Sequence, residues 1–486
     1  MESSFETPRP AANAVHRAFA MLGHHGLGIA LSVIGYLIPI ALVPHVLLSR
    51  RDRGTTVAWI ALIVLVPYAG ALCYWLLGHR KIERLAGRAR RAQAITRRAF
   101  VHAAAHGLED ADLAGIARVA RRCGALPPLD GNRTRIFDDN ARCFEEQLAA
   151  IDRARRSVEH EVYIFRPDRL GRRFLAAFAR AARRGVRVRV LVDGVGGLSL
   201  GGREVRALER AGGRLLTFLP VLRPRLRPRI NFRLHRKLLV VDDETCFLGS
   251  LNVGDELVGR SPRWRELHAR IDGPAAAASR ETFEADWVFA GGEAPEEGGL
   301  GLAATRGDEV VQLFASGPTD ELGATARVLF AAISIARDEV LLVTPYFVPG
   351  RELLAALESA ALRGARVRIA IPGVNDLRIV QAAARYSVPG LREAGVSVGS
   401  LPDQMLHAKA AVIDGKLAIV GSANLDRRSL DLSFELNAIF YGGEAVKRTR
   451  TSVLDILAAS VPFAVEPRTL PGRLFDACAR VLAPVL

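Results

Sequence analysis

Cysteine is scarce in this sequence and is not arranged for a disulfide framework or a metal site. The 486 residues contain five cysteines, none of them in a CxxC pair: Cys73, Cys123, Cys143, Cys246 and Cys478. Disulfide-stabilised domains and zinc sites need paired or regularly spaced cysteines. We therefore interpret all five as ordinary buried thiols.

Lysine is rare relative to arginine, with five lysines against 62 arginines. Such a skew commonly reflects base composition, but the remaining lysines then become candidates for sites that need a compact ammonium group. The net charge of +16 indicates an anionic partner, which could be phosphate, a lipid headgroup or nucleic acid. The lysines are Lys81, Lys237, Lys409, Lys416 and Lys447.

Charged residues are absent from two long apolar segments near the start of the chain, residues 27–48 and 57–77. Each is long enough to cross a hydrocarbon core of about 30 Å as a helix. We predict a transmembrane hairpin within residues 25–80, in preference to a signal peptide followed by a buried helix. A hairpin that does not fully cross stays possible, because Pro39, Pro44 and Pro67 can interrupt the helices.

The flanking charge predicts the orientation of this hairpin. The connecting segment SRRDRGTT is short, so both flanks should lie on one side of the membrane. Basic residues favour the cytoplasmic side, and those after the hairpin outnumber the three in the connection. We expect the rest of the chain in the cytoplasm. The flanking residues are Arg80, Lys81, Arg84, Arg88, Arg90, Arg91, Arg97 and Arg98.

The remainder of the chain contains one pattern twice. The first copy has an apolar segment at 158–165, an amphipathic helix pattern and RRGVRVRVLVD at 183–193; the second repeats this at 340–347 and 362–372. Apolar strands that alternate with helices are typical of βαβ units. We therefore predict an α/β fold with two repeats and mixed sheets under helices.

Each copy then reaches the same signature, H-x-K-x4-D-x6-GS-x-N. The first is HRKLLVVDDETCFLGSLN at 235–252 and the second is HAKAAVIDGKLAIVGSAN at 407–424, a constant offset of 172 residues. A lone H-x-K means little, as His79 and Lys81 show, but two complete copies are not coincidence. The residues selected are His235, Lys237, Asp242 and Asn252, and His407, Lys409, Asp414 and Asn424.

The chemistry of these side chains suits a phosphodiester. Histidine can act as nucleophile or general acid near neutral pH. Lysine and asparagine donors can hold the non-bridging oxygens as charge develops. Glu266 and Glu435, each about one strand beyond its own signature, are the candidates to orient the imidazoles. The signatures offer no cluster of carboxylates for a metal, and we expect no cofactor.

Local charge gives an expectation for the two histidines. His235 lies among Arg225, Arg227, Arg229, Arg233 and Arg236, and nearby positive charge disfavours an imidazolium. His407 follows LPDQML and should hold its proton more readily. On this reasoning His235 is the nucleophile and His407 the acid.

The paired signatures resemble the HKD motifs of the phospholipase D superfamily. More closely, the N-terminal hairpin and the segments YIFRPDRLG, NFRLHRKLLVVD, TPYFVP, IPGVND and GSANLDRRS resemble bacterial cardiolipin synthases over nearly the whole chain. Two features depart from many relatives: GSLN replaces GGLN, and the segment before the second motif lacks a tyrosine and a glutamate often found there. These departures leave the choice of acceptor open.

The resemblance implies two α/β repeats about a pseudo-twofold axis, with both histidines at one site and no required metal. One histidine would form a phosphohistidine and the other would protonate the leaving alcohol; Asp242 and Asp414 would give structural support. The implied reaction joins two phosphatidylglycerols into cardiolipin and releases glycerol, at a bacterial inner membrane. A phospholipase D hydrolase or another headgroup transferase is the alternative, and a nuclease is less favoured; we expect no nucleic-acid partner.

The expected organisation follows from these features. Residues 1–24 form an N-terminal tail, 25–80 the hairpin with helices at about 27–48 and 57–77, and 81–125 a basic helical linker. Residues 126–300 form the first repeat and 301–486 the second. Nothing in the sequence indicates an oligomeric state.

Overall fold

The computed structural model describes residues 32–49, 53–77, 87, 108–221, 232–259, 263–294, 303–318, 323–373, 378–465 and 469–482. The chain divides into two compact units, Met1–His79 and Arg80–Leu486.

The first unit is helical. Residues 32–48 form a helix, followed by α2 (Arg53–Leu65) and α3 (Pro67–Leu77). They enclose a small apolar core that includes Val46, Trp59 and Tyr74, where the Tyr74 hydroxyl lies 2.7 Å from the His45 ring. At Gly70 a Cβ atom would stand 2.5 Å from the Leu62 carbonyl oxygen, so glycine permits the close approach of α3 to α2.

The predicted second hydrophobic helix, 57–77, is therefore two shorter helices separated at Val66. Pro67 begins α3 because proline lacks an N–H and is tolerated in a first helical turn. Of the predicted first helix, residues 32–48 are helical and 27–31 lie outside the described residues. In the described part of the chain, we find no helix both long and apolar enough to cross a membrane.

The second unit contains both repeats. The first runs β1 (Leu129–Phe137), α6 (Asn140–Arg153), β2 (Ser157–Val162), α7 (Arg169–Arg183), β3 (Arg187–Asp193), α8 (Gly202–Arg210), β4 (Arg214–Phe218), β5 (Arg233–Leu234), β6 (Leu238–Val241), β7 (Thr245–Gly249), η1 (Asp255–Leu257), β8 (Arg263–Arg265), β9 (His268–Asp272) and α9 (Pro274–Phe289).

The second repeat follows the same course. It runs β10 (Glu309–Ser316), α10 (Ala324–Ser334), β11 (Glu339–Val343), β12 (Phe347–Val348), α11 (Arg351–Leu362), β13 (Arg366–Pro372), α12 (Arg378–Glu393), β14 (Ser397–Leu401), β15 (Gln404–Leu406), β16 (Ala410–Ile413), β17 (Leu417–Gly421), β18 (Leu425–Asp426), α13 (Arg427–Asp431), β19 (Ser433–Tyr441), α14 (Gly443–Ala458), β20 (Val461–Pro462) and α15 (Leu470–Leu482).

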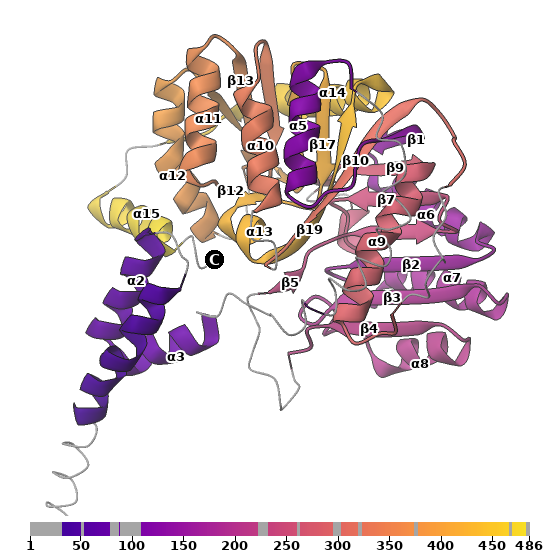
Figure 1. Cartoon of the computed structure of the whole chain (residues 1–486), viewed down its shortest axis with the longest axis horizontal. Coiled ribbons are helices and arrows are strands. Elements are labelled where there is room, and N and C mark those ends of the chain that lie inside the picture. Colours follow the sequence, from indigo (N-terminus) through magenta and orange to yellow (C-terminus); the bar gives the residue numbers. More distant parts are fainter. Residues whose placement is uncertain are drawn as a thin grey trace, which may run out of the picture. The chain divides into compact units, whose positions relative to one another are not determined.

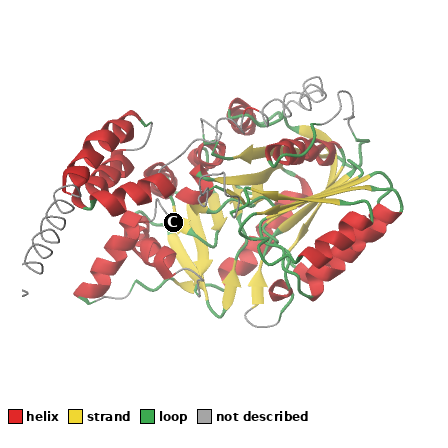
Figure 2. Ribbon diagram, turned by 90° about the horizontal axis from the view of Figure 1, so that it is seen from below, coloured by secondary structure: helices red, strands yellow, loops and turns green. Residues whose placement is uncertain are grey.

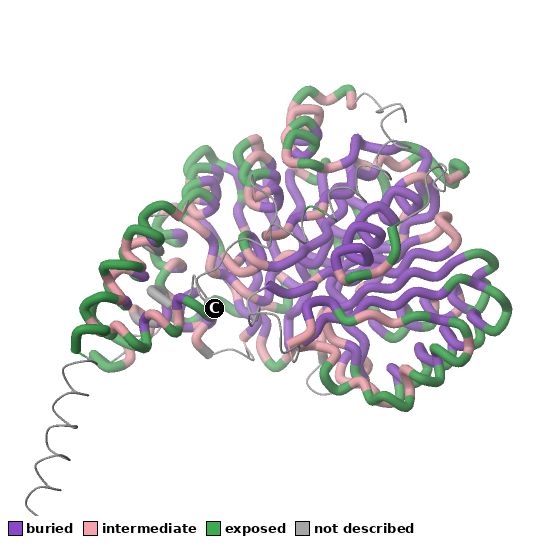
Figure 3. Tube along the Cα trace, turned by 60° about the horizontal axis from the view of Figure 1, so that its bottom comes forward, coloured by how far each residue is buried: buried purple, intermediate pink, exposed green. Residues whose placement is uncertain are grey.

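The strands of both repeats join in one mixed sheet. Its order is β20-β14-β13-β11-β16-β17-β19-β10-β1-β9-β7-β6-β2-β3-β4, with β1 and β10 antiparallel at the junction. Strands β2, β3 and β4 are parallel, as are β11, β13 and β14. The sheet lies between helices, and its strands are largely buried (Figures 1, 2 and 3). The predicted mixed α/β fold with two repeats is confirmed.

One core is common to both repeats. It contains Leu238 and Val240 of β6, Val412 of β16, and side chains from α9 and α14. Leu239 and Val241, which alternate with these along β6, face a separate core against α6 and α7. Helix α5 (Ala111–Arg122), within the predicted linker, packs into the core of the second repeat; most of residues 81–107 lie outside the described residues.

Candidate active site

Two short parallel strand pairs bring the histidines to the junction of the repeats. β5, which leads into His235, pairs with the start of β19, and the His235 N–H donates to the Phe434 carbonyl at 2.9 Å. β15, which leads into His407, pairs with β8, and the His407 N–H donates to the Arg265 carbonyl at 2.9 Å. Each histidine is thus held by a strand of the other repeat.

The carboxylates are paired with the imidazoles crosswise. His235 Nδ1 lies 2.9 and 3.0 Å from the two carboxylate oxygens of Glu435, and His407 Nδ1 lies 2.7 Å from Glu266 Oε1. A carboxylate accepts a hydrogen bond from Nδ1–H, which leaves Nε2 of the same ring for chemistry. Each half-site therefore needs residues from both repeats.

Serine residues of the two GS-x-N segments hold the strands that carry these acids. The Ser422 hydroxyl donates to Glu435 Oε2 at 2.5 Å and accepts from the Leu436 N–H at 3.0 Å. The Ser250 hydroxyl makes the corresponding backbone contacts to Leu267, at 2.9 and 3.1 Å. Serine recurs in both signatures, and this recurrence was the available signal for a role that the sequence alone did not reveal.

The two signature lysines lie beside their histidines. Lys237 Nζ donates to the His235 carbonyl at 2.6 Å, and Lys409 Nζ lies 2.7 Å from the His407 carbonyl and 2.8 Å from His407 Nε2. Burial, followed by the charge of Lys409, lowers the pKa of Lys237 well below its usual value. Two buried ammonium groups within electrostatic reach of each other make a site that favours an anion.

The two histidine–carboxylate pairs differ electrostatically. Burial raises the pKa of Glu435 to about 7. Burial alone would also raise the pKa of Glu266, but the charge of His407 and its hydrogen bond outweigh this, and the pKa falls. Burial and then Lys237 and Lys409 lower the pKa of His235 well below its usual value. Burial likewise lowers the pKa of His407, but Glu266 opposes that shift.

The arginine-based reason for a low His235 pKa was wrong in part. Arg233 is paired with Asp193 at 3.1 Å and Arg236 with Asp286, so both positive charges are compensated. The lowering comes first from burial, then from the lysines of both repeats, and after them from His407 and Arg428. Arg225, Arg227 and Arg229 lie outside the described residues.

Arg236 distinguishes the two half-sites. Its guanidinium donates to the Glu435 carbonyl at 3.1 Å and to the Ser316 carbonyl at 3.3 Å, in addition to its ion pair with Asp286 of α9. The second repeat has Ala408 at the equivalent position between histidine and lysine. The backbone that carries Glu435 is therefore held by a buried arginine that has no counterpart near Glu266.

Aromatic rings lie against both imidazoles. The Tyr163 and His235 ring centres are 5.2 Å apart, and those of Trp264 and His407 are 5.5 Å apart. Lys237 Nζ lies 5.6 Å from the centre of the Tyr163 ring. Tyr163 and Trp264 lie outside both signatures, so the sequence did not identify them as part of the site.

The other signature residues divide into two groups. Asn252 and Asn424 are buried; Asn252 Oδ1 accepts from the Ile164 N–H at 3.1 Å. Asp242 and Asp414 instead follow β6 and β16 at the opposite ends from the histidines, where they accept backbone N–H groups. Among the residues described, no group of three or more His, Cys, Asp or Glu side chains is placed to hold a metal.

A duplicated α/β fold with one His-Lys-Asn set from each repeat at a common site defines a phospholipase D-like protein. A family model described as "Cardiolipin synthase, PLD-like domain" matches residues 148–287 and 329–455, and "Phospholipase_D-nuclease N-terminal" matches 37–79. The chain belongs to the PLD-like cardiolipin synthase family.

Curated relatives agree over most of the chain. A cardiolipin synthase of Geobacillus kaustophilus is 34% identical, covering 90% of each chain, and one of Alkalihalophilus pseudofirmus is 31% identical, covering 94% of each. The crystal structure of a phosphatidylserine synthase of Haemophilus influenzae matches with a TM-score of 0.60, over 76% of this chain and 100% of the other, at 15% identity. That similarity shows the fold alone.

Proposed function

We propose that the protein transfers a phosphatidyl group between two phosphatidylglycerol molecules, making cardiolipin and releasing glycerol. The observation that carries this is the pair of unequal histidine–carboxylate contacts, His235 with Glu435 and His407 with Glu266, within reach of two buried lysines. The cardiolipin synthase relatives supply the substrate class.

His235 is the nucleophile in this proposal. With Glu435 ionised and accepting from Nδ1, the Nε2 lone pair of His235 attacks the phosphorus of the first lipid. The phosphorus–glycerol oxygen bond breaks, and His407 Nε2 gives its proton to the departing glycerol. The product of this half-reaction is a phosphatidyl group bound to His235 Nε2.

The second half-reaction reverses the roles of the proton. His407, now neutral, takes the proton from the headgroup hydroxyl of the second phosphatidylglycerol as that oxygen attacks the phosphohistidine. The nitrogen–phosphorus bond breaks, and cardiolipin leaves with His235 and His407 in their starting states. Lys237, Lys409 and the two asparagines hold the non-bridging oxygens in both steps.

Lipid analysis tests the reaction directly. The purified full chain is incubated with phosphatidylglycerol alone, and the products are identified by mass spectrometry, with the double variant His235→Ala/His407→Ala as control. We expect cardiolipin and glycerol in equal amounts, and excess glycerol should return cardiolipin to phosphatidylglycerol. Phosphatidic acid as the main product would instead identify a hydrolase.

An activated substrate tests the assignment of the histidines. p-Nitrophenolate departs without protonation, so loss of the acid should matter little to its release. We expect His407→Ala to release p-nitrophenol from phosphatidyl-p-nitrophenol in a burst, and His235→Ala to release none. The opposite pattern would exchange the two roles.

We further propose that the first unit inserts as a hairpin into a bacterial cell membrane, with the catalytic unit on the cytoplasmic side. Apolar side chains on its helices are exposed, including Tyr36, Leu48 and Leu65. In the second unit, helix α15 separately exposes Leu470, Leu474 and Phe475. Such faces suit the membrane interface and its acyl boundary.

Thiol labelling tests this topology. Ser49→Cys places a thiol after the first helix, and Arg203→Cys places one on exposed α8. In intact spheroplasts, an impermeant reagent should label Ser49→Cys above the level of the unsubstituted chain and leave Arg203→Cys unlabelled until lysis. Equal labelling of both before lysis would exclude a spanning hairpin with an internal catalytic unit.

A further inference from the structure

The internal repeat creates two related cavities, one at the end of β6 and one at the end of β16, on the side of the sheet farthest from the histidines. Asp242 follows β6 and accepts the backbone N–H groups of residues 155–157; Asp414 follows β16 and accepts those of residues 337–339. A cavity lies beside each aspartate. β6 has four residues, or roughly 13 Å, between the lysine end and the aspartate end.

In the second repeat, acidic side chains from the start of α5 pair with basic side chains that line the cavity. Asp112 at the start of α5 pairs with Arg337 at 3.0 Å, and Asp110 pairs with Lys416 at 3.1 Å. The remaining cavity has a volume of about 260 Å³. Here Arg337, two residues before β11, pairs with the carboxylate of Asp112.

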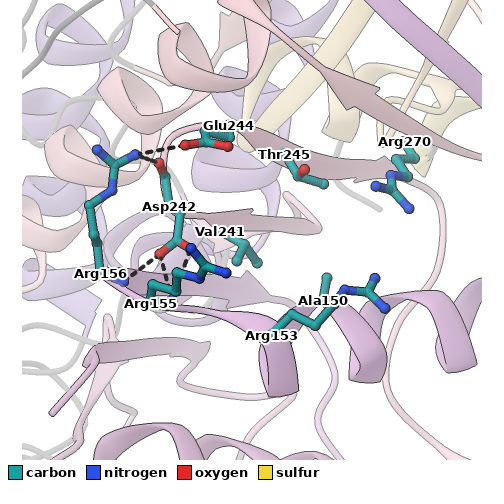
Figure 4. A pocket seen from close by; sticks show the side chains of 9 residues that line it. All are labelled: Ala150, Arg153, Arg155, Arg156, Val241, Asp242, Glu244, Thr245 and Arg270. Carbon is teal, nitrogen blue, oxygen red and sulfur yellow. Dashed lines mark hydrogen bonds and ion pairs between the residues drawn. The ribbon is translucent and has the colours of Figure 1, made fainter. Parts of the chain in front are cut away.

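The first repeat keeps the arginine but has no such acidic segment among the described residues. Arg155 is the equivalent of Arg337, since their backbone N–H groups bind Asp242 and Asp414 in the same way. The cavity is larger, about 470 Å³ (Figure 4). Within the described ranges, the guanidinium groups of Arg155 and of Arg153, which also lines the cavity, have no ion-pair partner.

The other charged groups of the cavity are already compensated. Arg156 and Arg306 pair with Glu244 at 3.4 and 2.8 Å, and Arg270 pairs with Asp272 at 3.0 Å. The carboxylate of Asp242 is directed to backbone N–H groups (Figure 4). Two positive charges therefore remain without a described partner, both on guanidinium groups.

We propose that this cavity is a binding site for a phosphate monoester dianion. Two guanidinium groups match the charge of such a ligand, which is between −1.5 and −2 near pH 7, and their donors match its oxygens. The ligand takes the position beside Arg155 that the Asp112 carboxylate has beside Arg337 in the second repeat. The site differs in chemistry from the catalytic centre, where the proposed substrates are phosphodiesters with one charge.

The ligand can come from solution or from a lipid, and the measurement separates these sources. Binding to the full chain in neutral detergent is followed by calorimetry with inorganic phosphate and glycerol phosphate. A second series uses neutral-detergent micelles that contain phosphatidic acid or, for comparison, diacylglycerol, which lacks the phosphate. A soluble ligand predicts heat in the first series, and a lipid ligand predicts heat only with phosphatidic acid.

A matched pair of variants locates the site. Arg153→Gln/Arg155→Gln removes the two unpaired guanidinium groups, whereas Arg203→Gln/Arg206→Gln removes the same charge from exposed α8. We expect monoester affinity to fall at least tenfold in the first variant and to be unchanged in the second. Both should keep the thermal unfolding midpoint and cardiolipin formation of the parent.

The outcomes decide the proposal without reference to catalysis. Equal loss in both variants would mean that only overall charge attracts phosphate, and unchanged binding in the cavity variant would place the anion elsewhere; either result overturns it. The absence of measurable heat with all monoesters would also overturn it. Because binding is measured directly, the result can be interpreted even if the protein does not catalyse the proposed transferase reaction.

Discussion

Replacing Glu435 by glutamine should stabilise the folded protein at alkaline pH and impair catalysis. Burial raises the pKa of Glu435 from 4.5 to about 7. At about 1.4 kcal/mol per pKa unit, the ionised carboxylate costs the folded state roughly 3 kcal/mol. A raised carboxyl pKa means that the folded state binds the proton more tightly, so the free energy of unfolding falls as pH rises from 4.5 to 7.

Glu435→Gln cannot titrate at this position, so its free energy of unfolding should not fall in this pH range. Glu266→Gln is the matched control, because the pKa of Glu266 is lowered once the charge and hydrogen bond of His407 overcome the effect of burial. Ionised Glu266 therefore contributes stability above its ordinary pKa, and that contribution is lost in the variant. At pH 8 the two isosteric changes should move stability in opposite directions.

Unfolding of the full chain in neutral detergent, measured at pH 5 and pH 8, gives the comparison. Relative to the parent, the free energy of unfolding of Glu435→Gln should increase by up to about 3 kcal/mol from pH 5 to pH 8. Glu266→Gln should be less stable than the parent at pH 8. Destabilisation by both variants at pH 8 would refute the inequality of the pairs.

Activity gives the second readout of the same change. The nucleophilic form of His235 needs an acceptor at Nδ1, so the parent rate should rise with pH through about 7 as Glu435 ionises. Glutamine accepts at every pH but carries no charge to stabilise the phosphohistidine. Glu435→Gln should lose this rising limb and reach a plateau at least about 100-fold lower. An unchanged rising limb would assign that titration to another group.

Three further outcomes are expected. Either His235→Ala or His407→Ala should lower cardiolipin formation about 1,000-fold or more with an unchanged circular dichroism spectrum, because nucleophile and acid act as a unit; near-full activity would contradict a shared site. Excess chelator should leave turnover intact, whereas a loss restored only by magnesium would show that a metal takes part. Arg236→Met should destabilise by about 3–5 kcal/mol, since Asp286 then remains buried without its partner; adding Asp286→Asn should recover part of this in a denaturation experiment.

The sequence predicted what depends on local pattern. The apolar LLVV and AAVI segments are β6 and β16. The constant offset of 172 residues indicated that both strands have the same environment. His235 and Lys237 themselves lie between β5 and β6 rather than in a strand, and Lys237 Nζ donates to the His235 carbonyl. Duplication of the pattern was sufficient to predict two related repeats in one fold.

The sequence could not predict which carboxylate pairs with which histidine across the two repeats. Glu266 and Glu435 are 169 residues apart, three fewer than the signature residues, and each lies closer in sequence to the histidine that it does not contact. The β5–β19 and β8–β15 pairs establish the crossed arrangement. The carboxylates that compensate Arg233 and Arg236 are likewise distant in sequence, at Asp193 and Asp286, which is why arginine density misled the electrostatic argument.

Inequality between the half-sites gives the proposed reaction a direction. Two equivalent histidines would share one proton equally, and either lipid position could then serve as donor. In this protein Glu266 has a lowered pKa and opposes the loss of a proton from His407, whereas buried Glu435 has a pKa raised to about 7 and adjoins a histidine whose pKa is strongly lowered. A proton that enters the site is therefore held better at His407 than at His235. In the proposed mechanism, the lipid whose leaving oxygen faces His407 is the donor, so two halves that share one sequence pattern would have different tasks.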